Sequence, residues 1–534
     1  MSIKGKVARF FSNRKQKLMI PNCRKKAYPA NGKTVLFWHH AGLSGLLGLE
    51  VYFALALQLR GYSPHFVLCD GTAPACLSRQ GETGDIDAWR LRCPECMKNH
   101  EYILKKMGFP YTPLRELLSR IDTGALYAEM PELPEDVKRF SCNGMDLVEN
   151  LMSGLIRYNM HGDLSAVGPR VIKEFAFDAA CNWLGCLEAI ERLKPASLFM
   201  SHCIFTDFGP PYKAAQAADT HVFTYQVAHQ ANTMMFSSLS KDSLVPGPSL
   251  TEEVWLEIAN DGRDEVYADK MEKFYAARYI GQESFGDMKN CLPGVANDRE
   301  RLLERYGVDG SKPVFALFTQ IRWDASADFT KLIFPTYDEF TLASIAAMAE
   351  NPRVHWLIKV HPAEKNEPLK AQTELFIRRH FPTLPGNITI IPFDSPFSPL
   401  DFFNAIDGGV TGCGTSGLEL AAMGKPVITA AQFLYSRRGF TFDSENVDDF
   451  INLLGRAESL PKLDEAQKLL AQKYLVTYLY RQAIPIAPLS NETWGLPDYR
   501  DVSQLLPNNN KYIDLIMAAF ENKRSALLPL DWIC

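Results

Sequence analysis

Apolar runs of strand length alternate with helical stretches along most of the chain. Residues 33–39 form a continuous apolar run, which is followed by a glycine-rich loop at 42–48, a helical stretch over about 50–60 and a second apolar run at 63–70. This order is typical of a βαβ unit with a buried parallel sheet. The same pattern predicts four more elements in the first half: a helix over about 172–193, a strand at 197–203, a helix at 212–218 and a strand at 221–228.

A second series of the same kind begins near residue 313. It predicts strands at 314–320, 353–360, 387–393, 408–411 and 426–430, separated by helices over about 338–350, 366–380, 400–406 and 416–423. The charged, helical stretch between the two series, about 250–310, predicts an inter-domain connection. Two successive halves of this kind predict an α/β protein with two Rossmann-like domains facing across a cleft, where a ligand binds at the carboxyl ends of the strands.

The chain of 534 residues suits two to four domains, at roughly 100–200 residues each. We expect a basic amphipathic leader at 1–30, an N-terminal Rossmann-like domain at 31–290, a C-terminal Rossmann-like domain at 291–490, and a helical segment at 491–534 that could pack back on the N-terminal domain.

The charge of the chain is unevenly distributed. Lys and Arg total 57 and Asp and Glu total 62, a formal net charge of −5, which excludes a generally basic surface that coats nucleic acid. Residues 1–30 carry nine basic groups and no acidic one, which leaves 48 basic against 62 acidic groups, about −14, in the rest of the chain. As a helix, this leader would place apolar residues in a stripe beside its cations, which suits an anionic membrane surface; a solvated basic arm is the open alternative. The stripe consists of Ile3, Val7, Phe10, Phe11 and Leu18.

Cysteine usage and hydropathy bear on the compartment. Twelve cysteines are far below the density of a disulfide scaffold, and no apolar run reaches the roughly 18 residues of a membrane-spanning helix. The leader also lacks the apolar core of a signal peptide. We therefore expect a cytoplasmic protein, or one that is peripheral at the inner face of the cytoplasmic membrane. Four cysteines within 28 residues, including one C-x2-C pair, could bind a structural zinc ion, with separate free thiols as the alternative: Cys69, Cys76, Cys93 and Cys96.

Two segments of the second half carry candidate chemistry. The predicted strand at 353–360 ends in Lys359, Val360, His361 and Pro362, so the imidazole lies at the edge where a ligand binds and can donate to a phosphate oxygen. About fifty residues later, a glycine-rich loop leads into a predicted helix at Gly414, Thr415 and Ser416, with Glu419 one turn further on. A helix N-terminus with hydroxyl donors can hold a phosphate, and Glu419 could accept from ribose hydroxyls. A capping histidine and an ordinary helix N-cap are the alternatives without a ligand.

The combination of these motifs resembles one family. Gly-Thr-Ser-Gly-Leu-Glu-x4-Gly-Lys-Pro-Val-Ile, some fifty residues after Lys-Val-His-Pro, is similar to the donor half of GT-B glycosyltransferases. It most resembles the bacterial capsule polysaccharide biosynthesis transferases, which include Kdo- and sialic-acid-transferring members. Tyr435 to Asp443 matches the stretch that follows the Pro-Val strand in that group, and Arg322-Trp-Asp is similar to a loop near the donor. The resemblance covers about 310–445.

The resemblance implies a nucleotide-sugar donor on the C-terminal domain and a glycan or glycolipid acceptor on the N-terminal domain. The donor's phosphate would be held by the His-Pro and Ser/Thr motifs, which that group uses with CMP-activated acidic sugars; the donor-binding residues are then Arg322, Lys359, His361, Gly414, Thr415, Ser416 and Glu419. An inverting enzyme needs a base for the acceptor hydroxyl, and the candidates at strand ends of the first half are His39, His40, Asp207 and His229. Of these, the position of His39 and His40 before the glycine loop favours them most. The donor half has no Asp-x-Asp to chelate a metal on a diphosphate, so we expect no cofactor in catalysis.

Other functions keep the fold but change the chemistry. A CDP-polyol phosphotransferase or a nucleotide-sugar epimerase would use the same donor site. A non-catalytic nucleotide-sugar-binding component of a polysaccharide assembly complex is the alternative from a different class.

Overall fold

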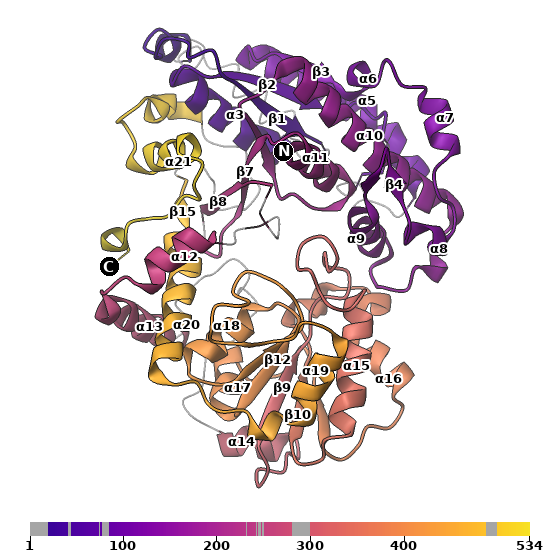
Figure 1. Ribbon diagram of the computed structural model, residues 1–534, viewed down its shortest axis with the longest axis vertical. Helices are drawn as coiled ribbons and strands as arrows, with labels where there is room; N and C mark the ends of the chain where they lie inside the picture. Colours follow the sequence, from indigo (N-terminus) through magenta and orange to yellow (C-terminus); the bar gives the residue numbers. More distant parts are fainter. Residues whose placement is uncertain are drawn as a thin grey trace. The chain divides into compact units, whose positions relative to one another are not determined.

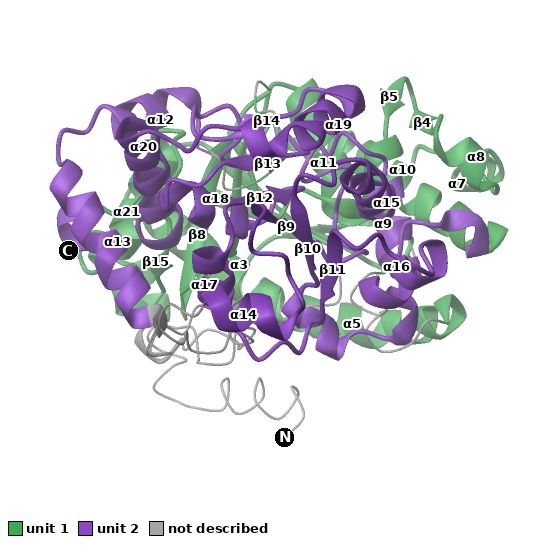
Figure 2. Ribbon diagram, turned by 90° about the horizontal axis from the view of Figure 1, so that it is seen from below, with its two compact units in different colours: residues 1–151, 168–248, 482–528 green, residues 152–167, 249–481, 529–534 purple. Residues whose placement is uncertain are grey.

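The computed structural model describes residues 20–40, 44–73, 75–76, 85–230, 232–241, 243, 247, 250–279, 299–486 and 499–533. The chain divides into two compact units, each built from separate stretches. Unit 1 comprises residues 1–151, 168–248 and 482–528, and unit 2 comprises residues 152–167, 249–481 and 529–534 (Figure 2). Each unit contains a mainly parallel sheet with helices between its strands, so the predicted α/β fold with two Rossmann-like halves is confirmed.

Unit 1 contains a seven-stranded sheet in the order β15-β8-β7-β6-β1-β2-β3 (Figure 1). The strands β3, β2, β1, β6 and β7 are parallel, and β8 and β15 are antiparallel additions at one edge. The apolar run that predicted the first strand is buried over its whole length, as expected for a strand with both faces covered. The strands are β1 (Thr34–His39), β2 (Ser63–Leu68), β3 (Tyr111–Pro113), β6 (Ser197–Ser201), β7 (His221–Val227), β8 (Thr233–Leu239) and β15 (Ile484–Pro485).

The main helices of unit 1 are α3 (Ser44–Leu59), α5 (Ile86–Met107), α10 (Pro169–Leu193), α11 (Phe205–Ala217) and α21 (Lys511–Glu521). The prediction of a helix at 212–218 was wrong at its start, because α11 continues through Pro210 and Pro211, which the sequence suggests as a boundary. Residues 482–528 pack on unit 1, where Arg60 Nη2 lies 2.5 Å from Asp514 Oδ1 and Arg60 Nη1 donates to the Leu505 carbonyl at 2.8 Å.

Unit 2 contains a six-stranded sheet in the order β11-β10-β9-β12-β13-β14, and every pair in it is parallel. Its strands are β9 (Val314–Phe318), β10 (His355–Lys359), β11 (Ile388–Ile391), β12 (Gly408–Thr411), β13 (Val427–Thr429) and β14 (Phe442–Asp443). Lys359 and Thr411 both pair in register with Phe318, so β10 and β12 end at the same level on either side of β9. Gly408 allows β12 to lie close to this strand, because a Cβ there would be 2.3 Å from Phe315 Cε1.

Helices of unit 2 include α12 (Glu252–Ala259), α13 (Asp264–Tyr279), α14 (Arg299–Arg305), α15 (Tyr337–Ala349), α16 (Thr373–His380), α17 (Pro399–Ala405), α18 (Thr415–Ala422), α19 (Val447–Gly455) and α20 (Glu465–Val476). We predicted that residues 250–310 connect the two domains, but the structure assigns this range to unit 2. Trp255 of α12, for example, packs on Tyr474 of α20 with ring centroids 5.4 Å apart. The bounds of the units accordingly differ from the predicted division at 290. The predicted helix at 366–380 is replaced in its first half by short 3-10 turns, because Pro368 interrupts it.

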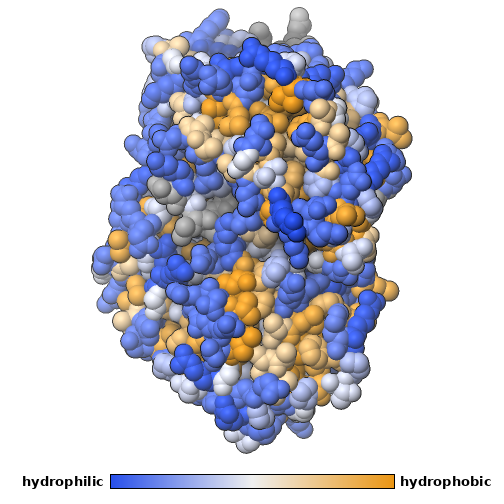
Figure 3. All heavy atoms as spheres, turned by 45° about the vertical axis from the view of Figure 1, so that its right-hand side comes forward, coloured by the Kyte–Doolittle hydropathy of each residue, from blue (hydrophilic) through white to orange (hydrophobic). Residues whose placement is uncertain are grey.

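Most of the leader lies outside the described residues, including its whole apolar stripe. Its last part is ordered on unit 1: Cys23 is buried, and Arg24 Nε donates to Gln58 Oε1 at 2.7 Å. Within the part of the chain that the structure describes, no helix is long and apolar enough to cross a membrane. On the face shown in Figure 3, hydrophilic residues predominate, with smaller groups of hydrophobic residues among them.

Candidate functional site

The strand order of unit 2 defines where a ligand would bind. The chain runs from β9 outward through β10 and β11, and then returns to the other side of β9 to form β12, β13 and β14. The order therefore reverses between β9 and β12. In open α/β sheets, ligands bind at this switch point, outside the carboxyl ends of the strands. His361 follows β10 and Gly414 follows β12, so both sequence-predicted motifs lie at this edge.

Residues that directly follow β9 connect the two motifs. The His361 backbone N–H donates to Thr319 Oγ1 at 3.2 Å, and Gln320 Nε2 donates to Thr411 Oγ1 at 3.2 Å. Thr411 Oγ1 also accepts the Gly414 N–H at 2.9 Å. Because neighbouring strands are about 4.8 Å apart, β10 and β12 lie roughly 10 Å from each other on either side of β9. The sequence did not identify Thr319, Gln320 or Thr411; the available signal was a polar residue at the end of an apolar run.

The His361 imidazole is partly buried and oriented by the backbone. Its Nδ1 accepts the Ala363 N–H at 3.2 Å, at the start of a 3-10 turn. A neutral imidazole that accepts at Nδ1 carries its proton on Nε2. Nε2 is therefore a donor of the kind that a phosphate oxygen accepts.

Helix α18 begins with an uncapped turn. Its N-cap is Gly414, which provides no side chain to satisfy the first backbone N–H groups, and Thr415 and Ser416 are partly exposed in that turn. Such an N-terminus carries a partial positive charge and favours an anion. Position 417 has no room for a side chain, because a Cβ on Gly417 would lie 2.6 Å from Tyr435 Oη.

The Tyr435–Asp443 stretch holds the glycine loop. The Tyr435 hydroxyl donates to the Gly414 carbonyl at 2.6 Å. Asp443 accepts from the Thr429 hydroxyl at 2.7 Å and from the Arg437 N–H at 2.8 Å. Through these hydrogen bonds, the Tyr435–Asp443 stretch positions the glycine loop and the residues next to it.

The predicted donor-binding side chains of Arg322 and Lys359 have hydrogen-bond partners within unit 2. Arg322 is buried and donates to both carboxylate oxygens of Asp338, at 2.6 and 2.8 Å, and its guanidinium carbon lies 4.0 Å from the Phe376 ring centroid. Lys359 Nζ donates to the carbonyls of Val360 and Pro392 at 3.1 and 3.2 Å. Glu419 is buried inside α18. In this structure Arg322 and Lys359 therefore support the loops around the switch point.

Glu364, which sequence reasoning did not single out, is fully buried beside the His-Pro turn. Its carboxylate accepts the Thr373 N–H at 2.8 Å and the Thr373 hydroxyl. Burial raises its pKa to about 7, against the opposing effect of these hydrogen bonds. The turn after His361 thus contains a buried carboxyl group whose pKa is near neutral pH.

The switch point of unit 1 lies between β1 and β6, by the same reasoning. His39 ends β1, and its Nδ1 lies 2.7 Å from Glu50 Oε2, while Glu50 Oε1 accepts the Tyr225 hydroxyl at 2.9 Å. Burial, with a smaller effect from His40, lowers the pKa of His39 to about 3. His39 is therefore neutral at physiological pH.

A second buried set surrounds His40 and Asp207. His40 Nε2 lies 3.4 Å from Asp178 Oδ1, an ion pair without good hydrogen-bond alignment. Burial acts to lower the pKa of His40, but Cys69 and Asp178 outweigh it and raise that pKa well above its ordinary value. Burial raises the pKa of Asp207 to about 7, while His40 opposes the rise. Among the described residues, Asp207 Oδ1 has no hydrogen-bond partner.

The four base candidates thus differ in their surroundings. His39 and His40 lie at and directly after the end of β1, Asp207 lies in the first turn of α11, which follows β6, and His229 is buried in the turn that follows β7. A protonated His40 cannot accept a proton. Glu50, Asp178 and Tyr225 also belong to these two buried sets. The sequence did not single them out, because they lie on other elements than the histidines they surround.

The predicted zinc set is not assembled in this structure. Among the described residues, no group of three or more His, Cys, Asp or Glu side chains is placed to hold a metal ion. Cys93 Sγ lies 3.6 Å from the Trp89 carbonyl, Cys96 Sγ lies 3.9 Å from His100 Nε2, and Cys69 interacts with His40. Three of the four thiols thus contact different neighbours, and the structural zinc site stays a prediction.

The first half does contain one Asp-x-Asp sequence, at Asp85 and Asp87. Asp85 caps α5 by accepting the Asp87 N–H at 3.0 Å, and Asp87 pairs with Arg170 at 2.5 Å. These contacts account for both carboxylates as parts of the fold.

Comparison with known proteins gives distant structural similarities. No family model and no curated protein matches the chain. The structure is similar to a β-Kdo 2,4-transferase, KpsC of Thermosulfurimonas dismutans, at 14% identity over 52% of this chain and 79% of that chain, with a TM-score of 0.32. It is also similar to the UDP-GlcNAc 2-epimerase of Neisseria meningitidis, at 10% identity over 83% of this chain and 95% of that chain, with a TM-score of 0.26. The spinosyn rhamnosyltransferase SpnG matches at 12% identity over 83% of this chain and 95% of that chain, with a TM-score of 0.25.

Proposed function

We propose that the protein is a GT-B-type glycosyltransferase that transfers a sugar from a nucleotide-sugar donor to a growing bacterial surface polysaccharide or glycolipid. The observation that carries the proposal is the union of the His361 turn and the Gly414 loop at one switch point, through Thr319, Gln320 and Thr411. This arrangement offers a neutral imidazole donor and the N-terminal amides of α18 at one sheet edge. Such donors stabilise negative charge on a leaving nucleotide without being charged themselves.

In this proposal the donor phosphate accepts from His361 Nε2, the first-turn amides of α18 and the hydroxyls of Thr415 and Ser416. The leading donor is a CMP-activated acidic sugar, as the matching motifs imply. Arg322 and Lys359 position the surrounding loops, since the polar groups of both already bond within unit 2.

Unit 1 is proposed to bind the acceptor and to supply the base. Asp207 suits this role best, because its pKa of about 7 lets it be unprotonated at neutral pH and still accept a proton in the transition state. The base removes the proton from the acceptor hydroxyl as that oxygen bonds to the anomeric carbon. The bond from that carbon to the nucleotide phosphate breaks, and the nucleotide leaves with the electron pair.

Product analysis after incubation with CMP-, UDP- and GDP-sugars, with and without a glycan acceptor, tests the proposal. A glycosyltransferase forms a new glycoside only when the acceptor is present. Conversion of the free nucleotide sugar to its epimer, or transfer of a phosphorylated polyol, would replace the proposed reaction with one of the alternatives. Binding without any turnover would favour a non-catalytic role.

We also propose that the basic arm holds the enzyme at an anionic membrane. The test is a deletion of residues 1–19. Cys23 and Arg24 are retained, because both pack on unit 1. The shortened protein should leave the pellet of anionic liposomes. Equal pelleting of both forms would contradict the idea.

A further inference from the structure

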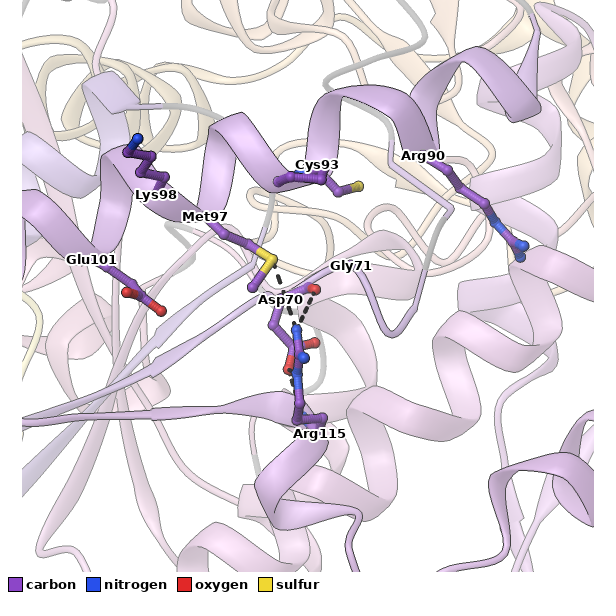
Figure 4. Close-up of a pocket in the computed structure, with 9 residues that line it drawn as sticks. Asp70, Gly71, Arg90, Cys93, Met97, Lys98, Glu101 and Arg115 are labelled. Carbon is purple, nitrogen blue, oxygen red and sulfur yellow. Dashed lines mark hydrogen bonds and ion pairs between the residues drawn. The ribbon is translucent and has the colours of Figure 1, made fainter.

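Unit 1 contains a pocket that takes no part in the chemistry proposed above. It has a volume of about 520 Å³ and lies between α5 and the turn that follows β2 (Figure 4). This size falls within the roughly 300–1,000 Å³ of small-molecule sites. The lining comprises Asp70, Gly71, Arg90, Cys93, Pro94, Met97, Lys98, Glu101 and Arg115.

The buried carboxylate of Asp70 orients the Arg115 side chain. Asp70 Oδ2 accepts Arg115 Nε at 2.6 Å and the Arg115 backbone N–H at 2.9 Å. The Asp70 side chain is 1% exposed, whereas that of Arg115 is 59% exposed. In Figure 4, dashed lines join the Arg115 guanidinium to Asp70 and to the sulfur of Met97. Arg115 Nη2 also donates to the Asp70 carbonyl at 3.1 Å and lies 3.9 Å from Met97 Sδ, so of the five N–H donors of this guanidinium the two on Nη1 remain among the described residues.

Arg90 repeats this arrangement at another part of the lining. Its Nη2 donates to both oxygens of Glu174, at 2.7 and 2.9 Å. Glu174 is 2% exposed and Arg90 is 48% exposed. Arg90 and Lys98 thus line the same cavity as Arg115, and Figure 4 shows their charged ends on opposite sides of it. Oriented arginines bind planar oxyanions such as carboxylate and phosphate especially well.

The rest of the lining suits a hydroxylated ligand. The carboxylate of Glu101 can accept from hydroxyl groups, and Met97 and Pro94 supply apolar surface for a sugar ring. We infer that this pocket binds a monosaccharide residue that carries a carboxylate or phosphate group. The inference rests on the proposed function only in assigning that residue to the acceptor; the binding itself can be measured separately.

Protection of Cys93 tests the inference on the full-length protein. Cys93 lines the pocket and is partly exposed, while Cys96 on the same helix is also partly exposed but lies outside the lining. Iodoacetamide alkylation of both thiols, measured by peptide mass spectrometry, is compared with and without glucuronate, glucose 1-phosphate, glucose and inorganic phosphate. Glucuronate or glucose 1-phosphate should slow alkylation of Cys93 and leave Cys96 unchanged, and glucose should have no effect.

Two variants and a matched control locate the bound anion. Calorimetric titration with the protecting sugar should show about tenfold weaker binding for Arg90→Gln and for Lys98→Gln, since each removes a charge-assisted contact. Arg92→Gln makes the same charge change on an exposed residue of α5 outside the lining, and should bind as the wild type does. Arg90→Gln leaves Glu174 its bond to the Tyr127 hydroxyl, so this variant is better suited to the test than Arg115→Gln.

Several results would overturn the inference. These are absence of protection by both anionic sugars at millimolar concentration, equal protection by glucose, equal affinity for inorganic phosphate, or unchanged affinity in both lining variants. CMP binding is measured on the same samples. Loss of CMP binding with intact glucuronate binding would count against the proposed function alone, and the reverse result would count against the pocket alone.

Discussion

The switch points of the two units occupy equivalent places in their sheets but differ in chemistry. In unit 1 the side chains there are buried and ionisable, with His39 and His40 at the end of β1 and Asp207 in the first turn of the helix that follows β6. In unit 2 the corresponding loops present Gly414, two partly exposed hydroxyl side chains and a single imidazole. One buried cation at that end, Arg322, is paired with Asp338.

The difference indicates how a reaction could be divided between the units. Backbone amides and hydroxyls do not titrate near neutral pH, so they can hold a phosphate over a wide pH range. Buried carboxyl and imidazole groups have shifted pKa values, which suits them to accept and release protons. The predictions below test whether proton transfer and phosphate binding separate in this way.

The largest effect is expected for Asp207→Asn. Removing a general base typically slows turnover by about 10²- to 10⁴-fold, whereas donor binding in unit 2 should be unchanged. Steady-state kinetics with saturating donor checks this. Glu135→Gln, an exposed control in unit 1, should react at the wild-type rate. Turnover of Asp207→Asn within a few-fold of wild type would assign the base elsewhere.

The same variant should also change the pH dependence of stability. Because the pKa of Asp207 is raised to about 7 in the folded state, the folded protein binds the extra proton between pH 4 and 7. Its contribution to stability is fully present below about pH 4 and is lost as pH rises to about 7. Chemical denaturation from pH 4 to 8 should therefore show a smaller decline for Asp207→Asn, by about 2–4 kcal/mol. Parallel curves would show that this carboxyl is already ionised throughout that range.

The next largest effect is on the stability of unit 2. Arg322→Leu removes one member of a buried ion pair and leaves Asp338 without its bidentate partner, which should cost about 3 kcal/mol. Nucleotide affinity of the folded fraction should change by less than about threefold, since the guanidinium is assigned a positioning role. Urea denaturation and calorimetry measure the two quantities. A large loss of nucleotide affinity with an unchanged free energy of unfolding would show instead that Arg322 contacts the donor.

A smaller effect is expected at Gly417. A Cβ there would meet Tyr435 Oη at 2.6 Å and Thr411 Cγ2 at 2.9 Å, so Gly417→Ala should displace the loop that these residues hold. We expect about tenfold weaker nucleotide binding and about 1–2 kcal/mol lower stability. Gly455→Ala adds the same methyl group where nothing lies within 4 Å and should leave binding unchanged. Equal binding by both variants would mean that the loop conformation is unimportant.

The sequence predicted those features that depend on local pattern. Buried strands read as apolar runs, and a glycine loop before a helix marks the Gly414 turn, so the carboxyl edge of each sheet could be found. The partners of Arg322 could not, because Asp338 and Phe376 meet it only through tertiary packing. The neighbours of Cys93 and Cys96 could not be predicted for the same reason, since the close spacing of these residues does not fix where their side chains point.

Local disruptions of regular structure were also hidden from the sequence pattern. Pro210 and Pro211 lie inside α11, although prolines usually mark a boundary, while Pro368 does interrupt a helix. Thr319, Gln320 and Thr411 connect the two motifs through hydroxyl and amide groups, residue types too common at strand ends to be recognised without the structure.

The most direct measurement is the thermal shift of the wild type and His361→Ala with CMP, CDP, UDP and GDP. His380→Ala, an exposed histidine on α16, is the matched control. A nucleotide that binds the folded state raises the midpoint of unfolding. If unit 2 holds the donor phosphate, CMP should raise the midpoint of the wild type and of His380→Ala but not that of His361→Ala, whose own midpoint should stay near the wild-type value. The same CMP-dependent rise in all three proteins would contradict the assignment of His361 to the donor phosphate.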